Sequence, residues 1–371
     1  METVDENDGA SGVADDVQGA AAWQAMVDGL AAAGRAMADH VADLSPAEQA
    51  DGFRALLRSL NNQLGRFEVD RADPELVPFN GWREKFFMDN PDFHYWVADI
   101  DDGRRYRLTG RIGDASYTSI TAYAAGGIID ASAASRLDQD SLELEADGSF
   151  EVMVSREQPP AGNWLPLPQG ANSIWVRSFY DDVHRDAHGE VHIEALDSAS
   201  VPPLIDTDRF VHRLQRLGKG ARSTVRGIST SVAEDLARPN EVRVWEEMQG
   251  GAAFTEPGIH YQRGAWQLGE RQALEIRLTP VECRYWNLML YSRFLNSLDH
   301  RHRPVSLTGA RAIAEDDSSV RVLLSATDPG EGNWLDTEGR PFGIFVVRWL
   351  HAETAPQLPE LRVVDLPGAS R

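Results

Sequence analysis

The chain has 371 residues, of which 42% are hydrophobic and 8% aromatic, as is ordinary for a soluble globular protein of two or three domains. Its formal net charge of −22 argues against a nucleic-acid partner, since phosphate contacts need clustered Lys and Arg. Cys283 is the only cysteine, which excludes an internal disulfide and a cysteine-rich metal site. We expect a cytoplasmic protein that does not enter a membrane, because there is neither a long apolar run nor a secretion signal.

An acidic tail and two helices are expected at the N-terminus. Residues 1–17 are acidic and predict a disordered tail. Apolar residues then recur at helical spacing over 18–41, and Ser45-Pro46-Ala47-Glu48 is a capping box that begins a second helix within a helical lead-in spanning 18–68. The apolar stripes, which we expect to pack into a core, are Trp23, Met26, Val27, Leu30, Met37 and Val41, then Phe53, Leu56, Leu57, Leu60 and Leu64.

The pattern changes near Phe93 to short alternating segments separated by Gly, Asp and Pro, which is typical of antiparallel β-structure. We expect a first β unit over 69–203, a helical linker over 204–250 and a second β unit over 251–371. The expected strands of the first unit are His94 to Ile100, Arg104 to Arg111, Ser116 to Ala124, Ser141 to Leu144, Phe150 to Ser155, Ser173 to Tyr180 and Glu190 to Ala195.

An internal duplication connects the two β units. Gly162-Asn163-Trp164-Leu165 recurs as Gly332-Asn333-Trp334-Leu335, and each copy precedes a strand with one arginine near its end, Arg177 or Arg348. Further pairs match at offsets of 166 to 171 residues: His94 and His260, Arg107 and Arg277, Tyr117 and Tyr285, Tyr123 and Tyr291, Asp147 and Asp317, Ser155 and Ser325. Offsets this regular predict that the second unit repeats the fold of the first.

These patterns together predict an α+β protein that is mainly β. It would contain two tandem antiparallel β-sandwich units, jelly-roll-like, each preceded by a helical segment.

Three segments of the first unit carry a family resemblance: Asn90-Pro91-Asp92, Tyr106-Arg107-Leu108-Thr109-Gly110 and the Asn-Trp-Leu-Pro run at 163–166. With them the chain resembles a bacterial family that carries the domain of unknown function 1214. The resemblance covers about residues 45–203 and is weaker in the second unit, where Asp336 replaces the proline. It implies tandem β-sandwiches, and it says little about chemistry, because no general activity is established for the family.

The repeated Asn-Trp pairs have two readings, a ligand contact or an anchor for the loop. Because both units keep them, we expect a structural role, with Trp164 and Trp334 largely buried. Arg177 and Arg348 stay open between an ion pair at the sheet edge and a contact with an anionic ligand.

Functional residues are sought among polar and aromatic side chains that lack a match in the other unit. His94 and Asp92 are the candidate acid and base, although the repetition of His94 as His260 also allows a core role. The candidate substrate-binding residues are Asn90, Tyr95, Trp96, Arg105, Arg177, Trp286 and Arg293, and Asn287 is a further unmatched residue.

His184, His188 and His192 recur at every fourth position, which superficially offers metal ligands. Gly189 between them predicts the tip of a hairpin, so the three imidazoles need not converge. We therefore expect no metal site, and neither a glycine-rich phosphate loop nor a nucleophile elbow points to a cofactor.

Two functions follow as expectations. The first is a small-molecule enzyme without a cofactor that acts by acid/base chemistry on a bulky organic substrate. The alternative is a noncatalytic module that binds a carbohydrate or lipid or serves in assembly. Whether the protein is an enzyme stays open. The expected partner is a small-molecule ligand, and self-association into a homo-oligomer stays open.

Overall fold

The computed structural model describes residues 10–126, 130–197, 206–248, 254–330 and 332–366. The chain divides into two compact units: Met1–Glu68 with Ala199–Ser231, and Val69–Ser198 with Val232–Arg371. The first is helical, and the second contains both β units. The expected boundaries at 203/204 and 250/251 lie outside the described residues, as do residues 1–9 of the expected tail.

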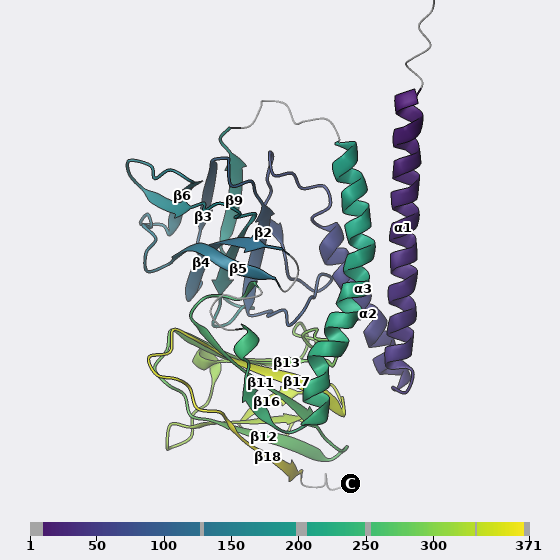
Figure 1. Ribbon diagram of the computed structural model, residues 1–371. Coiled ribbons are helices and arrows are strands. Elements are labelled where there is room, and N and C mark those ends of the chain that lie inside the picture. Colours follow the sequence, from purple (N-terminus) through teal and green to yellow (C-terminus); the bar gives the residue numbers. More distant parts are fainter. Residues whose placement is uncertain (1–9, 127–129, 198–205, 249–253, 331, 367–371) are drawn as a thin grey trace, which may run out of the picture. The chain divides into compact units, whose positions relative to one another are not determined.

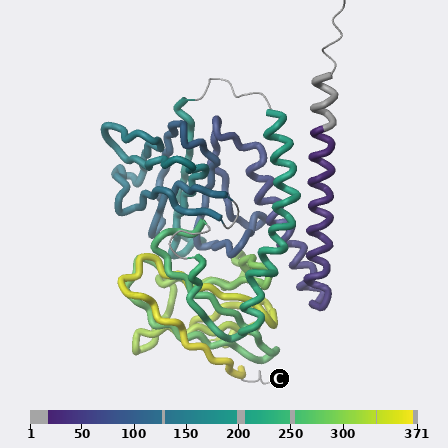
Figure 2. The backbone as a smooth tube through the Cα atoms, viewed as in Figure 1, coloured from purple at the N-terminus to yellow at the C-terminus, as the bar shows by residue number. Residues whose placement is uncertain are grey.

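Three long helices supply the helical unit: α1 (Ala10–Val41), α2 (Pro46–Leu64) and α3 (Thr207–Ala237), whose last residues belong to the β-rich unit. They are the long coiled ribbons of Figure 1 and can be followed in Figure 2. The capping box is confirmed, because the Glu48 N–H donates to Ser45 Oγ at 3.4 Å and that hydroxyl donates to the Glu48 carboxylate at 2.9 Å. α1 already begins at Ala10, inside the segment expected to be disordered. None of the described helices is long and apolar enough to cross a membrane.

α1 and α3 pack through a small apolar core that contains Met26 and Leu214. Gly29 and Gly218 lie at their closest approach, where a Cβ on Gly29 would come within 2.6 Å of the Gly218 Cα. Two glycines are therefore what allows the two backbones to touch.

The expectation that both apolar stripes are core surfaces is wrong in part. Trp23 on α1 is 57% exposed and Leu57 on α2 is 64% exposed. α2 buries a small and polar face instead, made of Glu48, Asp51, Gly52, Ala55, Ser59 and Asn62. Ser59 Oγ on that face lies 2.8 Å from Thr224 Oγ1 of α3, so hydrogen bonding replaces apolar contact at this position.

The β-rich unit contains the same pair of sheets twice. The first half has the sheets β1-β2-β8-β4-β5 and β7-β6-β3-β9; adding nine to each strand number gives the sheets of the second half, β10-β11-β17-β13-β14 and β16-β15-β12-β18. The described pairings are antiparallel except for β6 with β7 and β15 with β16, which are parallel. The predicted duplication and the α+β, mainly β fold are thereby confirmed.

The bounds of the strands in the first half are β1 (Val77–Pro78), β2 (Phe93–Asp99), β3 (Tyr106–Arg111), β4 (Tyr117–Ala125), β5 (Ala131–Asp138), β6 (Ser149–Ser155), β7 (Asn163–Pro166), β8 (Ser173–Phe179) and β9 (Glu190–Ala195). Those of the second half are β10 (Val242–Val244), β11 (Ile259–Gln267), β12 (Gln272–Leu278), β13 (Tyr285–Tyr291), β14 (Ser306–Thr308), β15 (Val320–Ser325), β16 (Asn333–Asp336), β17 (Phe342–Leu350) and β18 (Glu360–Asp365). Short 3-10 turns, η1 (Glu246–Met248) and η3 (Gly309–Arg311), lie between strands.

The repeated Asn-Trp pair has the same contacts in both halves. Asn163 bonds the backbone of Glu143 and Glu151, and Asn333 bonds that of the equivalent Ile313 and Arg321, all at 2.7–2.9 Å. The indole N–H groups of the neighbouring tryptophans donate to the carbonyls of Ser155 and Ser325 at 3.1 and 3.2 Å. Both motifs therefore fix the parallel strand beside its neighbour.

Trp164 and Trp334 are partly buried, and neither is exposed. The Trp334 indole N–H also donates to the Ser325 hydroxyl oxygen at 3.0 Å.

Each five-stranded sheet has two different faces. In the first half, one face packs on the four-stranded sheet, as Ala98 and Val176 do against Leu108 and Val152. The other, here called the inner face, meets the inner face of the second half, where Tyr285 packs on Phe93 and Phe179 at 5.5 and 5.6 Å between ring centroids.

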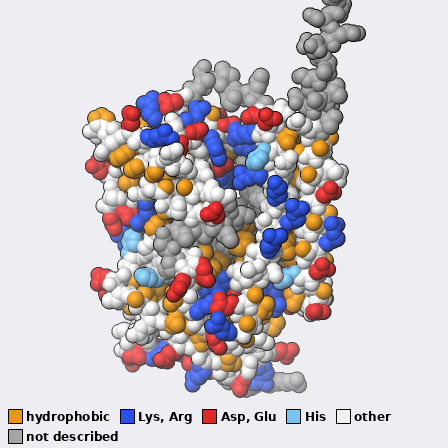
Figure 3. Space-filling view, in the orientation of Figure 1, with side chains coloured by type: hydrophobic (Ala, Val, Ile, Leu, Met, Phe, Trp, Pro, Cys, Tyr) orange, Lys and Arg blue, Asp and Glu red, His pale blue; other side chains and the backbone are white. Residues whose placement is uncertain are grey.

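The charge of the chain is spread rather than gathered on the side visible in Figure 3. Asp and Glu side chains there are interspersed with Lys and Arg. Several of the buried polar residues, among them Thr121, Arg177, Asn287 and Arg348, lie on the inner faces.

Candidate functional site

The inner faces carry a buried arginine each, at matching positions of β8 and β17. Arg177 lies in register between Tyr95 of β2 and Ser119 of β4, and Arg348 lies in register between Tyr261 and Asn287. Arg177 is 2% exposed and Arg348 is 4% exposed. We call their surroundings the first and the second arginine site.

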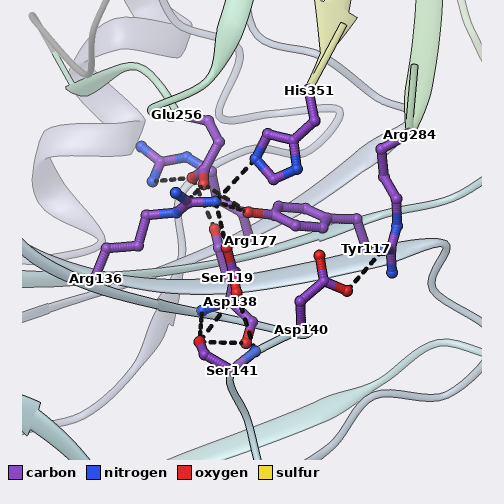
Figure 4. A network of polar contacts seen from close by, with 10 residues as sticks. All are labelled: Tyr117, Ser119, Arg136, Asp138, Asp140, Ser141, Arg177, Glu256, Arg284 and His351. Carbon is purple, nitrogen blue, oxygen red and sulfur yellow. Dashed lines mark hydrogen bonds and ion pairs between the residues drawn. The ribbon is translucent and has the colours of Figure 1, made fainter. Parts of the chain in front are cut away.

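Glu256 neutralises the first arginine site from the other half of the chain. Its carboxylate lies 3.4 Å from Arg177 Nη1 and 3.0 Å from Arg136 Nε, and it accepts hydrogen bonds from Ser119 at 2.7 Å and Tyr117 at 3.2 Å. Figure 4 shows these side chains converging on the carboxylate. Because four groups of the first half bind this carboxylate, it links the two halves of the β-rich unit. It is not free to act on a substrate.

A polar rim surrounds this carboxylate. Arg136 also pairs with Asp138 at 2.8 Å and contacts His351 Nε2 at 3.1 Å, while Arg284 pairs with Asp140 at 2.7 Å (Figure 4). Burial, together with the nearby Arg136 guanidinium, lowers the pKa of His351, and burial raises the pKa of Tyr117. His351 is therefore a neutral acceptor near pH 7 and Tyr117 a neutral donor.

The second arginine site is built the same way but without that carboxylate. Arg348 Nη2 donates to the Met88 carbonyl at 3.3 Å and to the Tyr291 hydroxyl at 2.8 Å. The Met88 contact mirrors the bond from Arg177 to the Phe254 carbonyl, and both carbonyl residues have a φ of 62°. In each half, the loop before the first long strand therefore contacts the arginine of the other half.

Asn90 stands in the second site where Glu256 stands in the first, since each precedes the proline of a matching loop. Asn287, in the place of Ser119, donates to Asn90 Oδ1 at 3.2 Å and to Asp92 at 2.9 Å. Ser306 also donates to Asp92, at 2.9 Å. Burial raises the pKa of the Asp92 carboxyl in spite of these bonds.

Next to the first arginine site lies an aromatic cluster centred on Trp175, which we call the Trp175 cluster. The Trp175 ring is 4.4 Å from that of Phe79 and 5.1 Å from that of Phe254, and Tyr95 and Tyr123 are at 6.4 and 6.3 Å. Phe79, Tyr95 and Phe254 are only partly buried, so the described residues do not close this cluster off.

Three buried polar groups of this inner face have no hydrogen-bond partner among the described residues: Trp175 Nε1, Thr121 Oγ1 and Ser173 Oγ. Their residues are 4%, 0% and 4% exposed. Thr121 is the register partner of Trp175, and Ser173 lies two residues before Trp175 on the same face of β8. Buried polar groups of this kind normally have a hydrogen-bond partner, and the described residues do not provide one here.

The second half carries apolar residues at the same three positions. Met289 and Val346 are register partners, as Thr121 and Trp175 are, and Ile344 takes the place of Ser173. All three are fully buried. The position of Val97 is taken by Arg263, which is bound to Asp235 at 2.5 Å. The second half thus has buried apolar side chains at the positions where the first half has unpartnered polar groups.

Four of the residues expected at the site lie together in this inner layer: Asn90, Asp92, Tyr95 and Arg177. His94 and Trp96 alternate with Tyr95 along β2 and lie on its other face. The His94 ring packs against His188 at 4.2 Å and Tyr180 at 5.1 Å. Burial, and secondarily His188, lowers the pKa of His94 to about 4.

The other three expected residues have separate surroundings. Arg105 is paired with Asp197 at 2.6 Å on the exposed side of the first sandwich. Trp286 stacks on Trp349 at 5.4 Å, on the opposite face of β13 from Asn287. Arg293 lies over the Phe342 ring at 5.0 Å.

The three histidines at every fourth position do not form a ligand set. His188 Nε2 lies 2.8 Å from the Val183 carbonyl, and His192 is exposed on β9. In the described part of the chain no three His, Cys, Asp or Glu side chains are placed to hold a metal ion.

Sequence reasoning missed Glu256, Thr121, Ser173 and Trp175. The duplication carried a signal for all of them. Glu256-Pro257 matches Asn90-Pro91 at the offset of 166 residues that relates His260 to His94. Thr121, Ser173 and Trp175 are polar or aromatic where the second copy has Met289, Ile344 and Val346.

Comparison with known proteins gives a family and a fold. A family model described as "Protein of unknown function (DUF1214)" matches twice, at residues 98–182 and 266–353. A crystal structure of an uncharacterised protein from Burkholderia cenocepacia is 29% identical, with a TM-score of 0.87 over 93% of this chain and 97% of that one. A Vibrio parahaemolyticus protein of known structure is 12% identical, with a TM-score of 0.50 over 84% of this chain and 97% of that one. None of the curated proteins matches. The DUF1214 family model therefore matches this chain twice, once in each half of the β-rich unit.

Proposed function

We propose that the protein binds a small, uncharged and largely apolar organic molecule at the Trp175 cluster. The observation that supports this most strongly is the set of three buried, unpartnered polar groups, Trp175 Nε1, Thr121 Oγ1 and Ser173 Oγ, on one face of one sheet. Apolar walls with a few convergent polar groups are the usual composition of a small-molecule site.

The polar groups define what the ligand must offer. An indole N–H only donates, so the ligand has to present an acceptor such as a carbonyl or ether oxygen to Trp175. The hydroxyls of Thr121 and Ser173 can donate or accept. Phe79, Tyr95 and Phe254 provide flat apolar contacts that suit a ring or an acyl chain.

The charge of the neighbouring arginine argues for a neutral ligand. Arg177 lies over the Trp175 ring at 4.9 Å, but its charge is already matched by Glu256. A ligand carboxylate would compete with a group that also holds Arg136, Ser119 and Tyr117.

Catalysis by His94 and Asp92 stays a prediction. With a pKa of about 4, His94 is neutral near pH 7 and could act there only as a base. His94 lies across the sheet from the Trp175 cluster, so binding at that cluster does not need it. The cytoplasmic location and the homo-oligomer also stay predictions.

Native mass spectrometry of the full chain, incubated with a cellular metabolite extract, tests the proposal. The variant Thr121→Met/Ser173→Ile/Trp175→Val gives the first half the residues of the second and so keeps the face apolar and filled. The wild type should retain a small molecule that the triple variant does not. Trp286→Phe, on the face of β13 that points away from the inner layer, is the control and should retain it.

Thermal unfolding of the same samples accompanies the measurement, since a loss of binding counts only in a folded chain. Equal retention by the wild type and a folded triple variant would contradict the proposal. So would a wild-type chain that retains nothing from extracts of several origins.

A further inference from the structure

The two arginine sites differ in how their charge is balanced. Arg177 has the Glu256 carboxylate at 3.4 Å, whereas no described carboxylate lies within ion-pair distance of Arg348. The oxygens of Asp92 bond Asn287 and Ser306, and those of Asp89 bond Ser297, so both act on the second site only at longer range. A buried guanidinium without a close counter-charge is costly.

The second arginine site has unpartnered polar atoms where the first site has the Glu256 carboxylate. Arg348 Nη1, Asn90 Nδ2 and Asn287 Oδ1 have no hydrogen-bond partner among the described residues, although their residues are 4%, 0% and 0% exposed. Asn287 is the register partner of Arg348 and contacts Asn90 at 3.2 Å, so the three belong to one cluster. Arg348 Nη1 and Asn90 Nδ2 are hydrogen-bond donors, and Arg348 Nη1 belongs to the charged guanidinium. Asn287 Oδ1 is an acceptor.

We propose that the second arginine site holds a small monovalent anion, of the size of chloride or formate, in the position that corresponds to the Glu256 carboxylate. The anion accepts from Arg348 Nη1 and Asn90 Nδ2 and supplies the counter-charge that Glu256 supplies in the first site. The anion therefore links the two halves of the β-rich unit at the second site, as Glu256 links them at the first. This inference is independent of the ligand at the Trp175 cluster.

Thermal unfolding of the full chain in sodium chloride and in sodium gluconate at equal ionic strength gives the first test. Gluconate is much larger than chloride or formate, so it serves as the control for general salt effects. The wild type should show a saturable, chloride-specific rise of the unfolding midpoint, on the order of 2 °C.

Two exchange variants make the test specific. Asn90→Glu/Asn287→Ser gives the second site the residues of the first, and the chloride-specific rise should disappear because the carboxylate is built in. Glu256→Asn/Ser119→Asn gives the first site the residues of the second, and the chloride-specific rise should grow because a second anion site is created.

Crystals of the wild-type chain grown in bromide locate the ion directly. An anomalous peak within hydrogen-bond distance of Arg348 Nη1 and Asn90 Nδ2 is expected. The same response of the wild type to chloride and gluconate would overturn the proposal. A water without anomalous signal at that position would overturn it as well, whether or not either exchange variant folds.

Discussion

At the scale of single residues, the informative groups are buried polar atoms that lack partners. Leaving one such group without a hydrogen bond costs about 1 to 3 kcal/mol, and the whole stability of a domain is about 5 to 15 kcal/mol. If nothing formed hydrogen bonds with the three groups at Trp175, Thr121 and Ser173, their combined cost would be a large part of that stability. The ligand that we propose would supply these partners, and the second half, which has apolar residues at the same places, would need none.

His94 allows a prediction about pH. Its pKa in the folded chain, about 4, is below the ordinary 6.5, so folding favours the neutral ring. The contribution of His94 to stability is complete above pH 6.5 and is lost as the pH falls toward 4. His94→Gln should flatten the fall of the unfolding free energy in this interval, while His192→Gln, at an exposed position, should leave it unchanged.

Urea unfolding at several pH values measures this difference, and NMR titration of the His94 ring gives its pKa directly. A titration midpoint near 6.5 would contradict the burial that the structure assigns to this ring.

At the scale of elements, close approach of helix backbones holds α1 and α3 together. Gly29 and Gly218 lie at the contact, whereas Gly34, one turn further along α1, has nothing within 4 Å of a Cβ. The same substitution in one helix therefore has opposite consequences at two positions.

Gly34→Ala should stabilise the chain by about 0.5 to 1 kcal/mol, because alanine is the better helix former. Gly29→Ala should destabilise it by about 1 to 3 kcal/mol, because its methyl group meets backbone that has no room to move. Chemical unfolding followed by the helical circular dichroism signal compares the two. Equal effects of both substitutions would show that α1 and α3 do not touch at Gly29.

The sequence predicted elements well where a periodic or capping signal was strong. The capping box at Ser45 and the strands that carry His94, Ser119 and Arg177 were expected and are present. β5 was missed, and a strand was wrongly expected at Ser141 to Leu144. Ala131–Asp138 is rich in small residues without alternation, and the Ser141 hydroxyl bonds Asp138 in a turn.

The site could be predicted only in part, because it depends on contacts between distant segments. Asn90, Asp92, Tyr95 and Arg177 were candidates, but nothing local to Arg177 indicated that its counter-charge is Glu256, 79 residues away. The alternation along β2 that separates His94 from Tyr95 was readable from the sequence. Which of the two faces meets the other half was not.

At the scale of the whole β-rich unit, the duplication works as an internal comparison. A loop of each half contacts the arginine of the other half. The Met88 and Phe254 carbonyls accept from Arg348 and Arg177 in the same way. Where the halves agree, as at the Asn-Trp pairs, the fold requires the residues. Where they differ, at the Trp175 cluster and beside Arg348, we propose that each place binds something that the other half does not.

We predict that the first half, and not the second, holds an organic ligand. A crystal structure of the full chain after incubation with the metabolite extract tests this most directly. The expected result is non-protein density against Phe79, Tyr95 and Phe254, with an acceptor atom within hydrogen-bond distance of Trp175 Nε1 and no counterpart beside Val346. Ordered waters alone at Trp175, Thr121 and Ser173, or a ligand bound elsewhere, would contradict it.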